Sequence, residues 1–381
     1  MDLNEGLRPD PSAIADGFGL YVHVPFCTTR CDYCAFATWT DREDLIDHYV
    51  KALCLEIDRA RAGDGWRVPE TVFFGGGTPS LLSVEQVTRV LDHAMPASTA
   101  EITLECNPES TDAPFLAGIA RAGVNRISLG VQSTKPHVLK GLGRTYHEGS
   151  IERALLAIAD AQITNYNIDL VFGGAGESAE DFTEGLLEVL DFDPHPSHIS
   201  AYALTIESGT PLARVPERHP DDDLLAERYE CAERVLSAHG YRWYEISNWA
   251  KPGAECRHNL SCWLGGEYRG VGCSAHSHLS GERSANVFSI DRYVEAIFST
   301  GNATARRERL GESERAEELL ALRLRTNLGV SPSLVDKSVF DDGLMEHSGD
   351  RATLTLRGRL LANEVAMRLV VPSKLESIAA H

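Results

Sequence analysis

The sequence predicts an α/β fold: a partial or closed (β/α) barrel with a C-terminal winged-helix-like appendage. Six short β-rich runs alternate with amphipathic helical patterns over roughly 200 residues, which is typical of βαβ units around a parallel sheet. A cluster of three cysteines directly follows the first run, where the loops of such a barrel carry chemistry. Residues 311–381 change to helices and a hairpin, which predicts the appendage.

Each barrel element has its own signal. The predicted strands are Gly19–Val24, Thr71–Phe74, Glu101–Cys106, Arg126–Leu129, Thr164–Phe172 and His198–Ala203. Helical spacing of apolar residues predicts helices around Ile46–Ile57 and Ile151–Ile158. Thr40 with Glu43, and Ser83 with Gln86, have the spacing of reciprocal capping boxes that begin helices.

Four segments are expected along the chain. They are a loose arm at 1–17, the barrel at 18–215, a less regular extension at 216–310 and the appendage at 311–381. The appendage should contain a helix around Glu314–Arg325 and a short helical stretch after Pro332. A hairpin at Leu344–Leu356, turning at Gly349-Asp350, and a final helix with Leu360, Leu361 and Val365 should complete it.

Composition excludes several classes of protein. A net charge of -20 argues against a nucleic-acid partner, because phosphate binding needs clustered Lys and Arg. The N-terminus lacks a basic start followed by an apolar stretch, and no apolar run approaches the roughly 20 residues that span a bilayer. We therefore expect a cytoplasmic protein without a transmembrane segment. Nine cysteines, an odd number, make a disulfide framework improbable in that reducing compartment.

Three of the cysteines form the motif Cys27-x3-Cys31-x2-Cys34. Three thiolates on one short loop can hold three corners of a four-iron, four-sulfur cluster and leave the fourth iron open. The alternative is structural zinc, which needs four ligands, usually as two separated pairs. His23 would have to fold back from its strand to become the fourth. Cys54, Cys106 and Cys231 are interpreted as packing residues.

With the residues around it, this motif resembles the radical S-adenosylmethionine superfamily. More narrowly, the chain resembles the group that contains the oxygen-independent coproporphyrinogen III oxidases (HemN) and the heme chaperones (HemW). The resemblance extends over nearly the whole chain and rests on Tyr21–Phe26, Tyr33-Cys34, Gly75–Pro79, Glu105–Pro108, Gly130–Ser133, Asn167–Leu170 and His258–Leu260. It implies a [4Fe-4S] cluster, S-adenosylmethionine and heme as cofactors.

The resemblance also implies a set of cofactor-binding residues. They are Tyr21, Tyr33, Gly76, Gly77, Thr78, Glu105, Gln132, Arg144, Asp169 and Ala203. Glycines after a strand let the backbone approach a ligand closely, although a tight turn alone would also explain them. Glu105, Gln132 and Asp169 stand at or near strand ends, where each could instead be a buried, hydrogen-bonded polar residue. Arg144 matches a family position that pairs with a carboxylate.

Two departures favour the chaperone branch over the oxidase. Few residues precede the first strand, and Phe36 stands where the oxidases have a fourth cysteine. The run His258–Trp263 also matches the H-N-L-x-Y-W signature of the chaperones, with Cys262 in place of the usual Tyr. A heme chaperone is therefore the first reading, and oxidative decarboxylation of coproporphyrinogen III is the second. A radical enzyme acting on RNA is a third, which the net charge disfavours.

His258 is the candidate heme ligand, since neutral imidazole commonly binds heme iron. Its alternative is a structural histidine near the barrel mouth. The expected partners are heme and an unidentified heme-acceptor protein, and peripheral membrane contact stays open. Whether the protein is an enzyme at all is not decided by the sequence.

Overall fold

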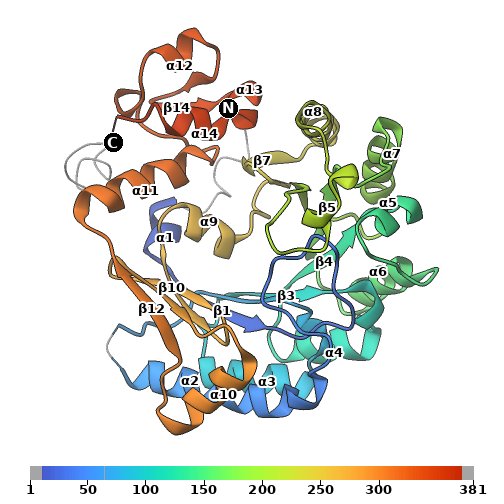
Figure 1. Ribbon diagram of the computed structural model, residues 1–381, viewed down its shortest axis with the longest axis vertical. Helices are drawn as coiled ribbons and strands as arrows, with labels where there is room; N and C mark the ends of the chain where they lie inside the picture. The colour runs from blue at the N-terminus through green and yellow to red at the C-terminus, as the bar shows by residue number, and fades with distance from the viewer. Residues whose placement is uncertain (1–10, 64, 371–381) are drawn as a thin grey trace.

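A computed structural model describes residues 11–63 and 65–370 (Figure 1). Its main feature is a 12-stranded sheet in the order β12-β11-β10-β9-β1-β2-β3-β4-β5-β6-β8-β7. The sheet curves but ends at β12 and β7, so the barrel is partial rather than closed. Its six central strands run parallel and confirm the predicted ones: β1 (Phe18–Val24), β2 (Thr71–Gly76), β3 (Glu101–Cys106), β4 (Arg126–Gln132), β5 (Asn165–Phe172) and β6 (His198–Ala203).

Helices cover the outer face of this sheet (Figure 1). They are α2 (Ile46–Ala62), α3 (Val84–Ala94), α4 (Ala113–Arg121), α5 (Pro136–Gly141), α6 (Ser150–Asp160), α7 (Ala179–Leu190) and α8 (Asp222–Ala238). The apolar face of each helix packs on the buried strands, as α2 does with Tyr49, Leu53 and Ile57. The core thus lies between sheet and helices, which leaves the inner face of the sheet free for polar side chains.

One of the two predicted capping boxes forms. Ser83 begins α3, with the Gln86 N–H donating to Ser83 Oγ at 3.3 Å and Ser83 N–H donating to Gln86 Oε1 at 2.8 Å. The prediction of a capping box at Thr40 and Glu43 is wrong. Glu43–Leu45 forms a separate 3-10 turn, and α2 begins only at Ile46. Hydrogen bonds from Trp39 N–H to Pro25 O and from Cys27 N–H to Trp39 O hold the preceding chain extended.

The extension widens the sheet on both edges. Strand β9 (Glu267–Val271) pairs in parallel with β1, and β10 (His276–Leu279), β11 (Glu282–Asn286) and β12 (Thr304–Arg309) follow it antiparallel. On the other edge lie β8 (Asn248–Ala250) and β7 (Arg242–Glu245). Helix α10 (Ile290–Ser299) packs on α2. The region predicted to be irregular therefore contains half of the strands of the sheet.

The two ends of the described chain also differ in part from expectation. Residues 1–10 lie outside the described residues, but Pro11–Asp16 forms helix α1, which packs on α9 (Arg257–Trp263) and buries Ile14. This part is therefore a docked helix and not a loose arm. No helix within residues 11–63 and 65–370 is long and apolar enough to cross a membrane.

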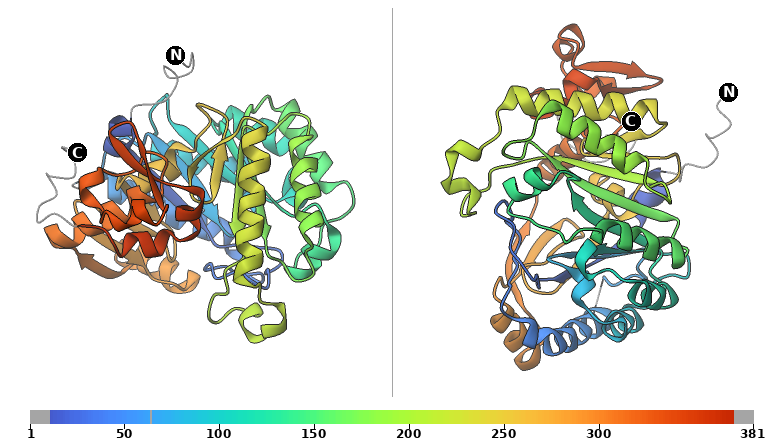
Figure 2. Two further views of the ribbon diagram at one scale, coloured as in Figure 1. Left: turned by 90° about the horizontal axis from the view of Figure 1, so that it is seen from above. Right: turned by 90° about the vertical axis from the view of Figure 1, so that its right-hand side faces the viewer.

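The appendage has the predicted order of elements and a hydrophobic core of its own. It consists of α11 (Glu312–Leu324), η7 (Pro332–Leu334), α12 (Ser338–Asp341), the hairpin of β13 (Met345–Ser348) and β14 (Arg351–Leu354), α13 (Leu356–Leu360) and α14 (Ala362–Ala366). The predicted final helix is thus two short ones. The appendage lies beside α8 (Figure 2), where Arg359 Nη1 donates to Glu233 Oε2 at 2.6 Å.

Candidate cofactor site

One cavity of about 490 Å³ opens at the C-terminal ends of the central strands. All but two of the predicted site residues line it: Cys27, Cys31, Tyr33, Cys34, Gly76, Gly77, Thr78, Glu105, Gln132, Arg144, Asp169 and Ala203. They come from the loop after β1 and from the C-terminal ends of β2 to β6, except for Arg144, which lies in the loop between α5 and α6. Parallel strands end on the same side of a sheet, which is why residues so far apart in sequence meet here.

The loop with the three cysteines is anchored through Asp32. Asp32 N–H donates to Leu142 O at 3.2 Å, Leu212 N–H donates to Asp32 O at 2.9 Å, and Arg218 Nη2 donates to Asp32 Oδ2 at 2.7 Å. On the other side of the loop, Thr78 Oγ1 donates to Cys27 Sγ at 3.5 Å. The loop has no regular secondary structure, but these contacts fix its position at the cavity.

The three thiols of Cys27, Cys31 and Cys34 lie on one loop at the edge of the cavity. Within the described residues, no three Cys, His, Asp or Glu side chains converge in a way that could hold one ion. A four-iron cluster gives each thiolate its own iron, so the sulfurs need not converge on one point. His23 is an unsuitable fourth zinc ligand, because its Nε2 is 3.0 Å from Ala37 O and its Nδ1 is 3.2 Å from Tyr21 Oη.

Three further cysteines, Cys54, Cys106 and Cys231, are not placed as cluster ligands. Cys106 lines the cavity, but burial raises the pKa of its thiol to about 12, and Thr111 hydrogen-bonds to it. Cys54 and Cys231 are buried on the helices α2 and α8. These three cysteines therefore behave as packing residues in the structure.

The glycines after β2 allow the cysteine loop to lie against the strand. A Cβ atom on Gly77 would come within 2.6 Å of Phe26 O and 3.0 Å of Cys27 Sγ. Gly76 has a φ of 112°, which side chains rarely adopt, and its N–H donates to Glu105 Oε2 at 3.1 Å. Gly76 is required by the turn, and Gly77 is required by the close approach of the cysteine loop. The turn and the close backbone approach are therefore compatible explanations of these glycines.

Two half-buried carboxyl groups, Glu105 and Asp169, face the cavity from β3 and β5. Burial, and then the neighbouring Asp169, raise the pKa of Glu105 to about 8. Burial also raises the pKa of Asp169, whose Oδ2 accepts from Ser128 Oγ at 2.8 Å and whose Oδ1 accepts from Asn167 Nδ2 at 2.8 Å. Two close carboxyl groups with few cationic partners favour a ligand that brings positive charge or hydroxyl donors.

The other predicted residues complete the walls. Gln132 has a φ of 66°, where the register of β4 on β5 shifts, and such left-handed backbone at a non-glycine residue is typical of functional sites. The guanidinium of Arg144 lies 5.2 Å from the centre of the Tyr146 ring and hydrogen-bonds to Tyr33. Tyr21 does not line the cavity: it lies behind Gly75, on which a Cβ atom would come within 3.1 Å of its ring.

The cavity also contains residues that were not predicted. Tyr202, Asn107 and Glu207 line it together with Phe36, whose side chain is exposed. Tyr202 precedes Ala203 at the end of β6, so its place beside a predicted residue was the available signal. Glu207 lies in an irregular loop, which carries no such signal.

His258 lies at the opposite end of the barrel. It is buried beside the first residues of β1 and β2, with Nδ1 2.8 Å from Thr71 Oγ1 and its ring stacked on Phe73. Burial, and then Arg126, lower the pKa of His258 to about 4. The alternative reading of His258 as a structural histidine placed it near the barrel mouth, and that location is wrong. Helix α9 instead covers the end of the barrel opposite the cavity, which we call the floor, and His258 lies there.

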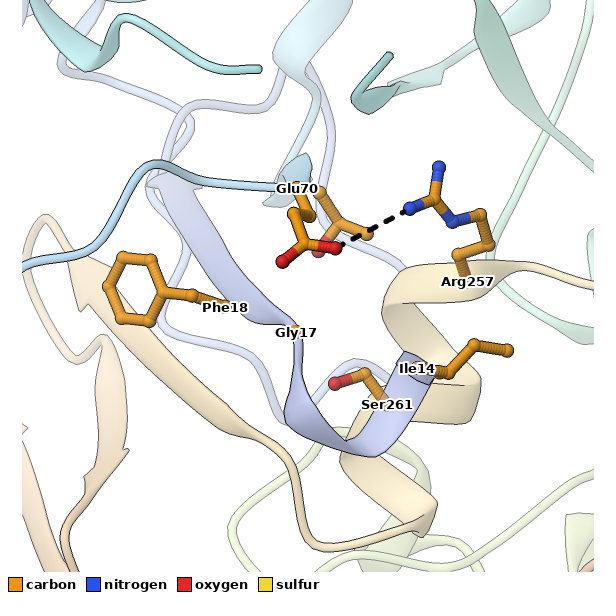
Figure 3. A pocket seen from close by; sticks show the side chains of 7 residues that line it. Ile14, Gly17, Phe18, Glu70, Arg257 and Ser261 are labelled. Atoms are coloured by element: carbon orange, nitrogen blue, oxygen red, sulfur yellow. Dashed lines mark ion pairs between the residues drawn. The ribbon is translucent and has the colours of Figure 1, made fainter. Parts of the chain in front are cut away.

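The main chain of α9 shows how the floor is held. The N–H groups of Arg257 and His258 donate to the buried Glu101 carboxylate, each at 3.0 Å, at the start of β3. Figure 3 shows the small cavity beside this contact, where Arg257 and Glu70 approach to 4.0 Å. It offers only about 10 Å³ to a water-sized molecule.

Comparison with known proteins agrees with this geometry. The model of the Radical SAM superfamily matches residues 21–187. The heme chaperone HemW of Mycobacterium tuberculosis is 41% identical over 96% of this chain and 97% of its own, and that of Escherichia coli is 34% identical over 91% and 96%. The structure of the coproporphyrinogen III oxidase HemN from Escherichia coli, described as a radical SAM enzyme, superposes with a TM-score of 0.80 at 22% identity, covering 94% of this chain and 92% of that one.

Proposed function

Because the chain belongs to the HemW family of radical S-adenosylmethionine proteins, we propose that it is a heme chaperone, which binds heme and passes it to an acceptor protein. The observation that carries this proposal is its 41% identity to a heme chaperone along almost the full length of both chains. The likeness to HemN, at 22% identity, shows the fold alone and carries no argument about activity. The acceptor is a protein partner that the sequence does not identify, and the cytoplasm is its expected place of action.

The cavity fits the cofactors of this superfamily. We assign the [4Fe-4S] cluster to Cys27, Cys31 and Cys34, whose thiols lie on one anchored loop. S-adenosylmethionine would be held beside it by Gly76, Gly77 and Thr78 after β2 and by Glu105, Gln132 and Asp169 on the neighbouring strands. When bound, the cluster and S-adenosylmethionine supply one-electron chemistry. Arg144, Tyr33 and Ala203 are assigned to the same ligand, and the half-buried Tyr21 lies next to Gly75, as Glu105 does.

The carboxylates can act on such a ligand in a simple way. Its sulfonium carries a permanent positive charge, and its ribose offers hydroxyl donors. Glu105 and Asp169 can accept from the hydroxyls and offset the charge once ionised, while burial in the cavity strengthens both interactions. These residues bind and orient the ligand, and no proton transfer is needed from them.

The first prediction concerns the choice between chaperone and oxidase. The protein with an anaerobically rebuilt cluster should bind heme saturably and should not convert coproporphyrinogen III to protoporphyrinogen IX. Phe36, a cavity-lining side chain that is 65% exposed, stands where the oxidases have a fourth cysteine, and a radical reaction needs a site closed to water. Heme titration and porphyrinogen turnover on one preparation measure the two activities.

His258 stays a predicted heme ligand. Because it is buried against Thr71 and Phe73, heme could reach it only if α9 moved from the floor. The same titration with His258→Ala tests the assignment: a lost heme Soret shift supports ligation, and unchanged binding discards it. Turnover without saturable heme binding would contradict the chaperone proposal and favour the oxidase.

A second prediction concerns pH. Affinity for S-adenosylmethionine should rise between about pH 6 and pH 9, by up to about tenfold per pH unit below the pKa of Glu105. The sign follows from that raised pKa of about 8: below it Glu105 is protonated and neutral, and above it the carboxylate can pair with the sulfonium. Asp169 raises and Arg126 lowers this pKa, so both belong to the same titrating environment.

Equilibrium dialysis with labelled S-adenosylmethionine measures this profile. Glu105→Gln has nearly the same shape and no charge, so its affinity should match the low-pH value of the wild type at every pH. An equally steep profile in Glu105→Gln would assign the titration to another group.

A further inference from the structure

A chain of buried hydrogen bonds joins the floor of the barrel to the cavity. Asn259 Nδ2 on α9 donates to Tyr244 Oη at 3.1 Å, and Tyr244 Oη is 2.9 Å from His198 Nε2. His198 Nδ1 is 2.7 Å from Asn167 Oδ1, and Asn167 Nδ2 donates to Asp169 Oδ1 at 2.8 Å. The chain therefore runs from the helix that carries His258 to a carboxylate that faces the cavity.

The partners give every bond in this chain one direction. Asn167 Oδ1 can only accept, so His198 must carry its proton on Nδ1. Its Nε2 must then accept, which makes the Tyr244 hydroxyl the donor. His198 stays neutral, because burial, and then Arg126, hold its pKa well below the usual range. In a neutral histidine only one ring nitrogen carries a proton. The bond that Nδ1 donates to Asn167 therefore fixes Nε2 as the acceptor of the bond from Tyr244.

The orientation of the Asn167 amide is the result that matters for the cavity. With Oδ1 accepting from His198, the Nδ2 group points to Ser128 Oγ at 2.7 Å and to Asp169. The hydroxyl of Ser128 then donates to Asp169 Oδ2 at 2.8 Å. Both carboxylate oxygens are thus held by donors, whereas a flipped amide would place an oxygen against an oxygen.

We propose that Tyr244, His198 and Asn259 are positioning residues for the cofactor cavity, which act through Asn167 to orient Asp169. Asn259, next to the candidate heme ligand His258, would then contribute to the binding of S-adenosylmethionine and not to the binding of heme. This inference rests on the proposed binding of S-adenosylmethionine in the cavity. Fully satisfied buried networks of this kind fix one arrangement, because each broken link leaves an unpaired polar group.

Tyr244→Phe is the sharpest test, because it removes one hydroxyl and leaves the ring. We expect the dissociation constant of S-adenosylmethionine to rise about tenfold, the lower end of the loss seen when an outer partner of a ligand-binding group is removed. Cluster absorbance and saturable heme binding should not change. Equilibrium dialysis on the reconstituted full-length protein measures the affinity.

Tyr241→Phe is the matched control. Tyr241 is as deeply buried, and its hydroxyl donates to Pro196 O, outside the chain. It should lower Tm about as much as Tyr244→Phe while leaving the affinity for S-adenosylmethionine at the wild-type value. An equal loss of affinity in both variants would mean general destabilisation and would overturn the inference.

A double-mutant cycle with Asp169→Asn decides whether the effect passes through Asp169. If it does, Tyr244→Phe should add little to the loss already caused by Asp169→Asn. Additive losses would overturn the inference, as would wild-type affinity in Tyr244→Phe. If Tyr244→Phe does not fold, Asn259→Ala tests the other end of the chain by the same measurements.

A wrong assignment of S-adenosylmethionine as the cofactor would give a different result from a wrong positioning role for Tyr244. Wild-type protein with a full cluster that binds no S-adenosylmethionine would overturn the cofactor assignment, and with it this inference. Wild-type protein that binds normally, with Tyr244→Phe equally tight, would overturn the inference alone.

Discussion

Replacing Cys27, Cys31 or Cys34 by Ser should abolish the broad iron–sulfur absorption of the protein after anaerobic reconstitution. Each of the three thiols is assigned its own iron, and a hydroxyl is a much poorer ligand for it than a thiolate. Within the described residues, the cavity offers one further thiol, Cys106, which is buried and bonded to Thr111.

The controls are Cys54→Ser and Cys231→Ser, which lie on the outer helices α2 and α8. They should cost some stability and keep the absorption, measured as iron and sulfide content together with the visible spectrum. Tight binding of zinc with no uptake of iron by the wild type would contradict the assignment.

The second large effect is expected from Gly77→Ala. One added methyl group would meet Phe26 O at 2.6 Å, Val24 O at 2.8 Å and Cys27 Sγ at 3.0 Å. Two of these atoms belong to the backbone and cannot move aside, so the cysteine loop must shift away from β2. Overpacking of this kind costs about 1–3 kcal/mol of stability, and a shifted Cys27 should leave the rebuilt cluster labile.

Chemical denaturation and the half-life of the cluster absorbance measure the two consequences. Gly63→Ala is the matched control, because its added methyl group would meet nothing closer than 3.5 Å. It should be neutral or slightly stabilising, since Ala restricts the unfolded chain more than Gly does. A Gly77→Ala protein as stable as the wild type, with a lasting cluster, would show that the loop does not depend on this contact.

The central strands could be predicted because each is a short run with mostly buried side chains. Runs such as Gly19–Val24 and Thr164–Phe172 are mainly apolar, and helical patterns separate them. The strands of the extension carry no such signal. Strands β11 and β12, which pair antiparallel although α10 lies between them in the chain, are polar and partly exposed, with Arg283–Glu308 and Arg307–Glu282 ion pairs across them. Pairing with β1 through β9 makes them part of the sheet, and that contact is invisible in local sequence.

The cavity residues could be found because strand ends of a parallel sheet converge. Glu105 and Asp169 illustrate this, since each stands at or near the end of its own strand. The location of His258 could not be found in the same way. It follows an irregular stretch, and its place depends on Glu101 at the start of β3, which accepts from the first N–H groups of α9.

The pairing of β1 with β9 has a consequence for biosynthesis. Phe18 lies opposite Glu267, so the strand that leads into the cysteine loop has one edge unpaired until the ribosome has made most of the chain. During that time the nascent protein exposes a row of free backbone groups, which is a site for wrong association. Every residue that lines the cavity has been made by then, up to Glu207, so the strand under the cysteine loop completes its pairing only after the residues of the cavity have been synthesised.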